Sequence, residues 1–261
     1  MTNFDFKHLR VETQGAVAVI SLNRPEKRNA INDEMLSEIE AFFDSPPEEA
    51  KVVVIDGKGK HFCAGLDLAE LCHRSAVEVM EHSRWWHRVF DKIETGKLPV
   101  IVALHGAVVG GGLELAAAAH IRVADDTTFY ALPEGQRGIY VGGGASVRLA
   151  RLIGASRIAD MMLTGRSYTG EDGSKVGFSQ HLTEEGGALE KALTLAAKVA
   201  DNAPLTNYAI LQALPRIQDM SRADGLFVES LMAALVQTAP EAQERMTDFL
   251  EGRAQKAGQD R

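Results

Sequence analysis

The sequence has little cysteine and no excess of basic charge, and each shortage excludes a class of protein. Two cysteines, Cys63 and Cys72, are too few for a disulfide framework in 261 residues, so we expect a reducing, cytoplasmic setting. Lysine and arginine total 28 against 36 aspartate and glutamate, which gives a formal net charge of -8. A general nucleic-acid-binding protein needs a basic face to displace phosphate counterions, so we expect no nucleic-acid partner.

Signals for secretion and for a membrane span are also weak. Residues 1–8 carry a single lysine and no apolar run follows it, so this segment lacks the layout of a secretory signal. Residues 98–119 are almost wholly apolar over about the length that a bilayer requires. They include His105, Glu114 and three consecutive glycines, however, and such a break favours a buried strand, a turn and a buried helix. We therefore expect no membrane association.

Alternating strand and helix patterns predict an α/β fold for most of the chain. The expected strands are residues 9–13, 17–22, 52–55, 100–104, 121–124 and 128–130. Asn32 and Ser75 are expected to cap helices between them, and such strand-then-helix units predict a largely parallel sheet covered by helices. Alanine-rich helical segments, interrupted by Pro204, Pro215 and Pro240, dominate towards the end. We predict an α/β core over residues 1–201 and a helical region over residues 202–261.

Three glycine-containing segments stand where backbone groups can face a ligand. They are His61–Leu68, Gly106–Glu114 and Gly142–Ser146. A turn of small residues leaves backbone N–H groups unobstructed, and a helix N-terminus presents N–H groups that attract negative charge. Each segment alone is more typical of a tight turn, and the second one misses the G-x-G-x-x-G spacing of a dinucleotide site. The third is expected to open another helix.

Two glutamates lie in apolar surroundings beside these segments. Glu114 is just inside the helix expected after the triple glycine, and Glu134 lies between Pro133 and Gly135. Removing a carboxylate from water is costly, so each must be paired, hydrogen-bonded or functional. A structural ion pair with Arg122 or Arg137 is the alternative to a catalytic role.

Other residue patterns favour structural roles. No strong zinc spacing is formed by the four residues His61, Cys63, Cys72 and His73, so we expect no metal. No Gly-x-Ser-x-Gly elbow supports a serine hydrolase. Trp85 and Trp86 are expected on the packed face of a long helix, with contact to a bound acyl group as the alternative.

Taken in order, these motifs resemble those of the crotonase (enoyl-CoA hydratase/isomerase) superfamily. Asn23–Ala30 resembles its N-terminal signature, Phe62–Asp67 its first oxyanion-hole segment and Val109–Ala116 its second. Glu134 stands where hydratases of the family have their second catalytic acid, and Met162–Arg166 resembles a later family segment. The resemblance covers nearly the whole chain.

The resemblance implies a spiral of ββα units, followed by a C-terminal helical region that forms homotrimers, often paired into hexamers. It implies that the backbone N–H groups of Leu66 and Gly111 form the oxyanion hole for a thioester carbonyl. It implies contacts with coenzyme A at Lys27, Arg28, Ala64 and Leu68. The partner would be an acyl-CoA thioester, and no separate cofactor is expected because coenzyme A is part of the substrate.

Glutamate at both acid positions resembles the hydratases within this superfamily. The resemblance implies reversible syn hydration of a trans-2-enoyl-CoA, in which Glu114 deprotonates water at Cβ and Glu134 protonates Cα. The alternatives are another reaction through the same enolate (isomerisation, C–C cleavage or thioester hydrolysis) and a non-catalytic oligomeric binding protein. Ala119-His120 and Arg137–Gly144 depart from the usual family sequences beside the presumed acyl pocket. These departures concern the acyl group more than the enolate chemistry.

Overall fold

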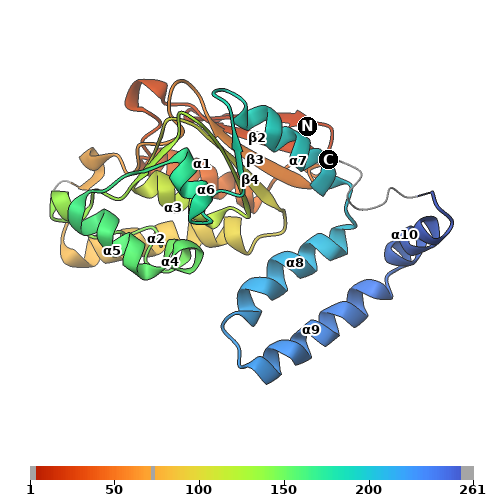
Figure 1. Ribbon diagram of the computed structural model, residues 1–261. Helices are drawn as coiled ribbons and strands as arrows, with labels where there is room; N and C mark the ends of the chain where they lie inside the picture. The colour runs from red at the N-terminus through yellow and green to blue at the C-terminus, as the bar shows by residue number, and fades with distance from the viewer. Residues whose placement is uncertain (1–3, 72–73, 254–261) are drawn as a thin grey trace. The chain divides into compact units, whose positions relative to one another are not determined.

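The computed structural model describes residues 4–71 and 74–253. The chain divides into two compact units, Met1–Ala200 and Asp201–Arg261, which are described separately (Figure 1). The first unit carries all the strands of the described residues, and the second is helical. The α/β fold class with a C-terminal helical region is confirmed. The trimerisation role of the second unit stays a prediction.

A six-stranded sheet forms the centre of the first unit. Its strand order is β1-β2-β3-β4-β6-β9, and all neighbours are parallel except the β1–β2 hairpin. The strands are β1 (Leu9–Gln14), β2 (Val17–Leu22), β3 (Val52–Gly57), β4 (Val100–Leu104), β6 (Ile121–Asp125) and β9 (His181–Thr183). β2, β3 and β4 are buried along their whole length, as expected for valine- and isoleucine-rich strands covered on both faces.

A second, three-stranded sheet leads into the triple glycine of residues 110–112. It consists of β5 (Ala107–Val109), β7 (Phe129–Ala131) and β8 (Tyr168–Thr169), with β5 and β7 parallel. The sequence interpretation missed β5 because three residues between glycines are too short to show a periodic pattern. This strand nevertheless carries the chain from the main sheet to the triple glycine.

Helices cover the sheets of the first unit. They are α1 (Asp33–Asp44), α2 (Ala76–Glu94), α3 (Gly111–Ala118), α4 (Arg148–Ile153), α5 (Ala155–Thr164), α6 (Gly170–Lys175) and α7 (Ala188–Ala200), with 3-10 turns η1 (Pro25–Lys27), η2 (Leu68–Leu71) and η3 (Gly135–Arg137). The predicted caps are confirmed: the Asn32 side chain accepts a hydrogen bond from the Met35 N–H at 3.0 Å, and Ser75 forms a capping box with Glu78.

The apolar stretch of residues 98–119 is divided among β4, β5 and α3. All eight residues of α3 are buried, because this helix lies inside the first unit. Within residues 4–71 and 74–253, we find no helix that is both long and apolar enough to cross a membrane.

The two faces of the main sheet pack against different helices. On one face the large side chains of α1, α2 and α3 meet apolar strand residues in the main core. On the other face α7 contributes Ala188, Ala192, Ala196 and Ala200, which recur every four residues and so form one helical stripe. These methyl groups let the helix lie close to Val52, Val54 and Ile101.

The second unit contains α8 (Pro204–Ile217), α9 (Arg222–Gln237) and α10 (Pro240–Leu250), and α8 packs against α9. Pro204 and Pro240 occupy first helical positions, where a missing N–H costs no hydrogen bond. The expectation that Pro215 interrupts a helix is wrong, because it lies inside α8. α9 exposes the apolar residues Leu226, Phe227, Leu231 and Leu235.

Gly112→Ala should destabilise the first unit even though alanine is the better helix former. A Cβ at position 112 would lie 2.5 Å from the backbone oxygen of Cys63 and 2.7 Å from its Cβ. Such overpacking costs about 1–3 kcal/mol, against about 1 kcal/mol gained in helix propensity. Urea denaturation should show a lower midpoint. Gly142→Ala is the matched control, because its Cβ would meet nothing closer than Ser83 Oγ at 3.6 Å. Equal midpoints for the two variants would contradict this packing argument.

Candidate active site

Two backbone segments approach each other closely at the centre of the first unit. A bridge joins Cys63 to Val108, with the Val109 N–H donating to the Cys63 carbonyl at 3.0 Å. Gly65 has φ 99°, and a Cβ there would lie 2.7 Å from the Val109 oxygen and 3.1 Å from the Gly111 nitrogen. Only glycine permits both the left-handed backbone and this contact.

This approach brings the predicted oxyanion-hole donors together. A Cβ built on Gly111 would lie 3.2 Å from the nitrogen of Leu66. In the described parts of the chain, neither of these two N–H groups has a hydrogen-bond acceptor. Gly111 is the first residue of α3, where an N–H has no partner within the helix. Both residues border one pocket, so two unpaired donors are available to a ligand there.

Cys63 stabilises the turn that carries Leu66. Its thiol donates to the Asn29 carbonyl at 3.0 Å, and its sulfur accepts from the Gly65 N–H at 3.4 Å. Burial raises the pKa of this thiol to about 12, so it stays neutral and unreactive. Asn29 has a left-handed backbone with φ 55°, and its side-chain amide donates to the carbonyls of Lys58 and His61.

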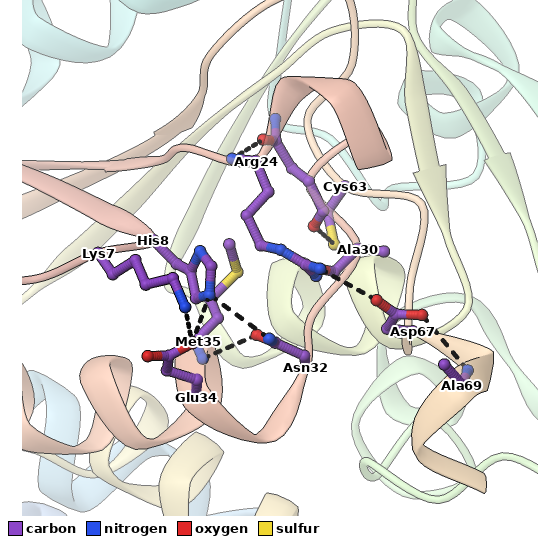
Figure 2. Close-up of polar contacts among 11 residues, drawn as sticks. Lys7, His8, Arg24, Ala30, Asn32, Glu34, Met35, Cys63, Asp67 and Ala69 are labelled. Carbon is purple, nitrogen blue, oxygen red and sulfur yellow. Dashed lines mark hydrogen bonds and ion pairs between the residues drawn. The ribbon is translucent and has the colours of Figure 1, made fainter. Parts of the chain in front are cut away.

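The N-terminal motif also holds the same turn in place. Figure 2 shows the Arg24 guanidinium extending between Ala30 and Asp67, where it donates to the Ala30 carbonyl and to Asp67 Oδ2 at 3.1 Å. Asp67 directly follows Leu66 in the turn. Segments 23–30 and 62–67, which are separate motifs in the sequence, therefore form one hydrogen-bonded unit.

The pocket has a volume of about 440 Å³ and lies entirely in the first unit. It is lined by Ala64, Gly65, Leu66, Leu68, Ala76, Val79, Met80, His82, Ser83, Trp86, Gly110, Gly111, Glu114, Glu134, Arg137, Ile139, Tyr140, Val141, Gly142 and Gly143. Most of these residues are apolar or glycine. The two predicted acids, Glu114 and Glu134, both lie in this wall.

Glu114 is a buried carboxylate held by backbone amides. Its side chain projects from the first turn of α3, and its Oε1 accepts from the N–H of Gly143 at 2.8 Å and of Ala145 at 3.0 Å. Burial raises its pKa, and these N–H groups oppose that shift by favouring the ionised form. The third glycine run therefore serves this carboxylate. The expectation that it opens a helix needs correction, since α4 begins only at Arg148.

Glu134 has a different environment. It immediately precedes η3, its residue is 7% exposed, and its Oε2 is buried without a hydrogen-bond partner among the described residues. Burial, with a further contribution from the charge of Glu114, raises its pKa to about 7. A Cβ on Gly110 would lie 2.8 Å from its Oε1, so this carboxylate borders the residue next to the Gly111 N–H.

Neither glutamate forms the ion pair that was the structural alternative. Among the described residues, the Arg122 guanidinium donates to backbone carbonyls, including that of Phe178 at 2.6 Å, and no ion pair joins Arg137 to Glu114 or Glu134. Burial lowers the pKa of Arg122 to about 10. The ion-pair interpretation with these arginines is therefore wrong.

Sequence reasoning missed Arg148, which supports the amide turn around Glu114. Its Nη1 donates to the Gly143 carbonyl at 3.1 Å, and its Nε donates to Glu94 Oε2 at 2.5 Å. It also pairs with Asp91, so this buried guanidinium links the turn to the last two turns of α2. No local signal marks this role, since its two acidic partners, Asp91 and Glu94, lie more than fifty residues away in the sequence.

The four predicted coenzyme A contacts lie in two settings. Ala64 and Leu68 line the pocket, while Lys27 and Arg28 are exposed side chains of the N-terminal motif. The Arg28 carbonyl accepts from the Ala64 N–H at 3.0 Å, which places the two segments side by side. Their contact with coenzyme A stays a prediction.

The structure separates the two tryptophans. Trp86 is 4% exposed and lines the pocket, and a Cβ on Gly111 would lie 2.8 Å from its ring. The Trp85 indole donates instead to Glu40 Oε2 at 2.7 Å, on another side of α2. At Trp86, the packed face of α2 therefore also forms part of the pocket wall.

His120, at the position where the family commonly has an acid, has a structural role. Its Nδ1 accepts from the Val100 N–H at 2.9 Å, and its Nε2 donates to the Glu94 carbonyl at 3.0 Å. Burial lowers its pKa, so the ring is neutral. No group of acidic, histidine and cysteine side chains in the described residues is placed to hold a metal. Cys72 and His73 lie outside the described residues.

Comparisons with known proteins agree with this geometry. The enoyl-CoA hydratase/isomerase family profile matches residues 12–259. A solved structure from Rhodopseudomonas palustris, named as a candidate enoyl-CoA hydratase, is 56% identical, with a TM-score of 0.92 and coverage of 94% of this chain and 95% of that one. The 2,3-dehydroadipyl-CoA hydratase of Escherichia coli is 31% identical over 247 residues, covering 94% of this chain and 96% of its own. The short-chain-enoyl-CoA hydratase of Clostridium acetobutylicum is 28% identical over 252 residues, covering 95% and 97%.

The profile covers nearly the whole chain, and the paired amides, the two glutamates and the supporting N-terminal motif all occur within the matched residues. We conclude that this chain belongs to the enoyl-CoA hydratase/isomerase family and is an enzyme of the enoyl-CoA hydratase type.

Proposed function

We propose that the enzyme catalyses the reversible syn addition of water to a trans-2-enoyl-CoA, giving a 3-hydroxyacyl-CoA. One observation supports this reaction above the others: two buried carboxylates with different surroundings line the same pocket as two unpaired backbone N–H groups. Hydration needs an acid and a base acting on one substrate, together with donors for the carbonyl oxygen. The pocket supplies all three.

The oxyanion hole acts on the thioester carbonyl. When water adds at Cβ, negative charge moves through Cα to the carbonyl oxygen and forms an enolate. The N–H groups of Leu66 and Gly111 are fixed by the backbone before the substrate arrives, so they stabilise this charge without reorganising. The indole of Trp86 is buried against Gly111, and an apolar neighbour of this kind lowers the local polarity and strengthens the interaction.

The surroundings of the two glutamates assign their roles. Glu114 accepts two backbone hydrogen bonds that stabilise its ionised form, so it is suited to orient and deprotonate the attacking water. Glu134 has a buried oxygen without a partner in the part of the chain that the structure describes and a pKa of about 7, so it holds a proton near neutral pH and can deliver it to Cα. The proton taken from water and the proton given to Cα balance, and the pair returns to its starting state by proton exchange.

Replacing either acid with glutamine should abolish most of the turnover. Glu114→Gln and Glu134→Gln should each lower kcat for hydration of crotonyl-CoA or a longer 2-enoyl-CoA by about 10² to 10⁴. Loss of enoyl absorbance, with product identification, measures this. Glu81→Gln is the matched control, because Glu81 is exposed on α2 outside the pocket. Near-normal hydration by either active-site variant would rule out the two-glutamate mechanism. Conversion of a 3-enoyl-CoA by Glu114→Gln alone would favour isomerisation.

The raised pKa of Glu134 predicts a falling alkaline limb in the pH profile. The active pair carries one proton, and above a pH of about 7 this proton is lost from the free enzyme, so kcat/KM should fall about tenfold per pH unit. A profile that stays flat to pH 9 would contradict the assignment of Glu134 as the acid.

A stability measurement tests the same pKa independently of catalysis. The folded state favours protonated Glu134, so the wild type loses stability as the pH rises from the ordinary value of 4.5 to about 7. Glutamine at position 134 carries no charge at any pH. The free energy of unfolding of Glu134→Gln should therefore exceed that of the wild type by an amount that grows between pH 4.5 and about 7 and then levels off. We expect a difference on the order of 2 kcal/mol at pH 8.

The oxyanion hole can be tested with a matched pair of variants. Gly111→Pro removes the N–H, whereas Gly111→Ala keeps it, and both place a Cβ against Trp86 at 2.8 Å. Proline is tolerated at a first helical position, so the comparison isolates the donor. Gly111→Pro should have a kcat at least about a hundredfold below that of Gly111→Ala. The bound enoyl-CoA carbonyl should also absorb at a higher frequency in the proline variant. Equal values in both measurements would exclude the Gly111 N–H as a donor.

A further inference from the structure

One face of α2 forms an apolar wall of the pocket. Ala76, Val79, Met80, Ser83 and Trp86 recur at helical spacing and all border the pocket. The opposite wall, from the segment after Glu134, adds apolar side chains. His82 lies on the α2 wall and is the imidazole of this lining.

His82 is held in a fixed orientation by a carboxylate. Its Nε2 lies 2.6 Å from Asp33 Oδ1, and Asp33 Oδ2 accepts from the Arg74 guanidinium at 2.7 Å. The side chain of His82 is 10% exposed. The Trp86 indole N–H also donates to this Nε2 at 3.3 Å, so both neighbours of the ring engage the same nitrogen. The other nitrogen, Nδ1, has no hydrogen-bond partner in the described portion of the chain.

Trp86 sets the distance between His82 and the carbonyl site. One edge of its indole lies against Gly111 and Gly143, while its Nε1–H donates to His82 Nε2 at 3.3 Å. His82 is one turn of α2 before Trp86, about 6 Å along the helix axis. The imidazole is therefore separated from the oxyanion hole by roughly the indole itself, too far to take part in the proton transfers at Cα and Cβ.

Apart from the two acids, the other polar side chains of the pocket are either hydrogen-bonded within the wall or exposed. Ser83 Oγ donates to the Gly142 carbonyl at 2.6 Å, so its hydrogen is already used within the wall. Arg137 and Tyr140 are exposed at the rim. His82 thus combines burial, fixed orientation and an unused nitrogen in an otherwise apolar surface.

We propose that the acyl group of the physiological substrate carries a hydroxyl group several bonds from the thioester, which hydrogen-bonds to His82 Nδ1. This inference rests on the proposed acyl-CoA function of the pocket. A hydroxyl group fits because it can donate to an unprotonated Nδ1 and accept from a protonated one. A carboxylate is disfavoured, since the Asp33 carboxylate already lies 2.6 Å from the same imidazole and Glu114 lines the same pocket, while the Arg137 side chain is exposed. The apolar wall binds the carbon skeleton of the acyl group, and His82 selects an acyl group that carries a hydroxyl.

Glutamine and asparagine provide a matched test at position 82. The terminal amide of glutamine occupies the place of Nε2 and can keep the contact with Asp33, whereas that of asparagine occupies the place of Nδ1. Binding of saturated thioesters would be measured by calorimetry in pairs: hexanoyl-CoA and 6-hydroxyhexanoyl-CoA, octanoyl-CoA and 8-hydroxyoctanoyl-CoA, and 3-phenylpropanoyl-CoA and its 4-hydroxyphenyl counterpart. Arg84→Gln, exposed on α2 outside the pocket, serves as the control.

For at least one pair, the wild type and Arg84→Gln should bind the hydroxylated thioester about fivefold more tightly, the usual worth of one hydrogen bond. His82→Gln should lose this preference while keeping its thermal stability, and His82→Asn should retain part of it. No preference in the wild type for any pair, or an unchanged preference in His82→Gln, would overturn the proposal. Because these ligands cannot be hydrated, the preference can hold even if the hydratase assay fails. The two proposals therefore fail separately.

Discussion

The close approach of the backbone at Gly65-Leu66 to that at Gly110-Gly111 is the constraint on which the rest of the site depends. A side chain at Gly65 would strike the Val109 oxygen, and one at Gly111 would strike Trp86. The same approach fixes the two amide nitrogens and places the Glu134 carboxylate against Gly110. Because the contact is between backbones, its geometry does not depend on rotamers, and this is the rigidity that a preorganised donor pair requires. The buried Cys63 thiol and the Arg24 guanidinium then hold the turn from behind.

Two carboxylates of the same type have different surroundings here: Glu114 accepts two backbone hydrogen bonds, whereas Oε2 of Glu134 has no partner among the described residues. Glu114 receives two N–H donors from the turn at residues 143–145, and Arg148 binds the carbonyl of that turn to Asp91 and Glu94. Within residues 4–71 and 74–253, Oε2 of Glu134 has no hydrogen-bond partner, and its carboxylate lies within the field of Glu114. Burial alone would raise both pKa values together. In the proposed mechanism the amide turn separates the roles of the two glutamates, although none of its side chains reacts.

The sequence predicts those parts of the structure that are encoded locally. Long β-branched runs predicted β2, β3 and β4, and the capping residues Asn32 and Ser75 located two helix starts, because these signals arise within a few residues. The ordered motifs identified the family, which the profile confirms. β5 was too short to carry a pattern, and Pro215 lies in a helix that tertiary structure maintains.

The sequence identified individual residues of the site but not the contacts that those residues make with one another. Nothing near Gly143 or Arg148 in the sequence indicates that they serve Glu114, since those contacts arise only when the segment folds back across α2 and α3. The same limit applies to Asp33 and His82, which are forty-nine residues apart in the sequence and in contact in the structure. Trp86 joins these separate elements, because one indole borders the oxyanion glycine, the Glu114 turn and His82. In the proposed reaction, polarisation of the carbonyl and contact with the acyl group therefore share one wall. A change of substrate specificity at this wall cannot alter Trp86 without also disturbing the carbonyl site, whereas residues one turn earlier in α2 can vary independently of the chemistry.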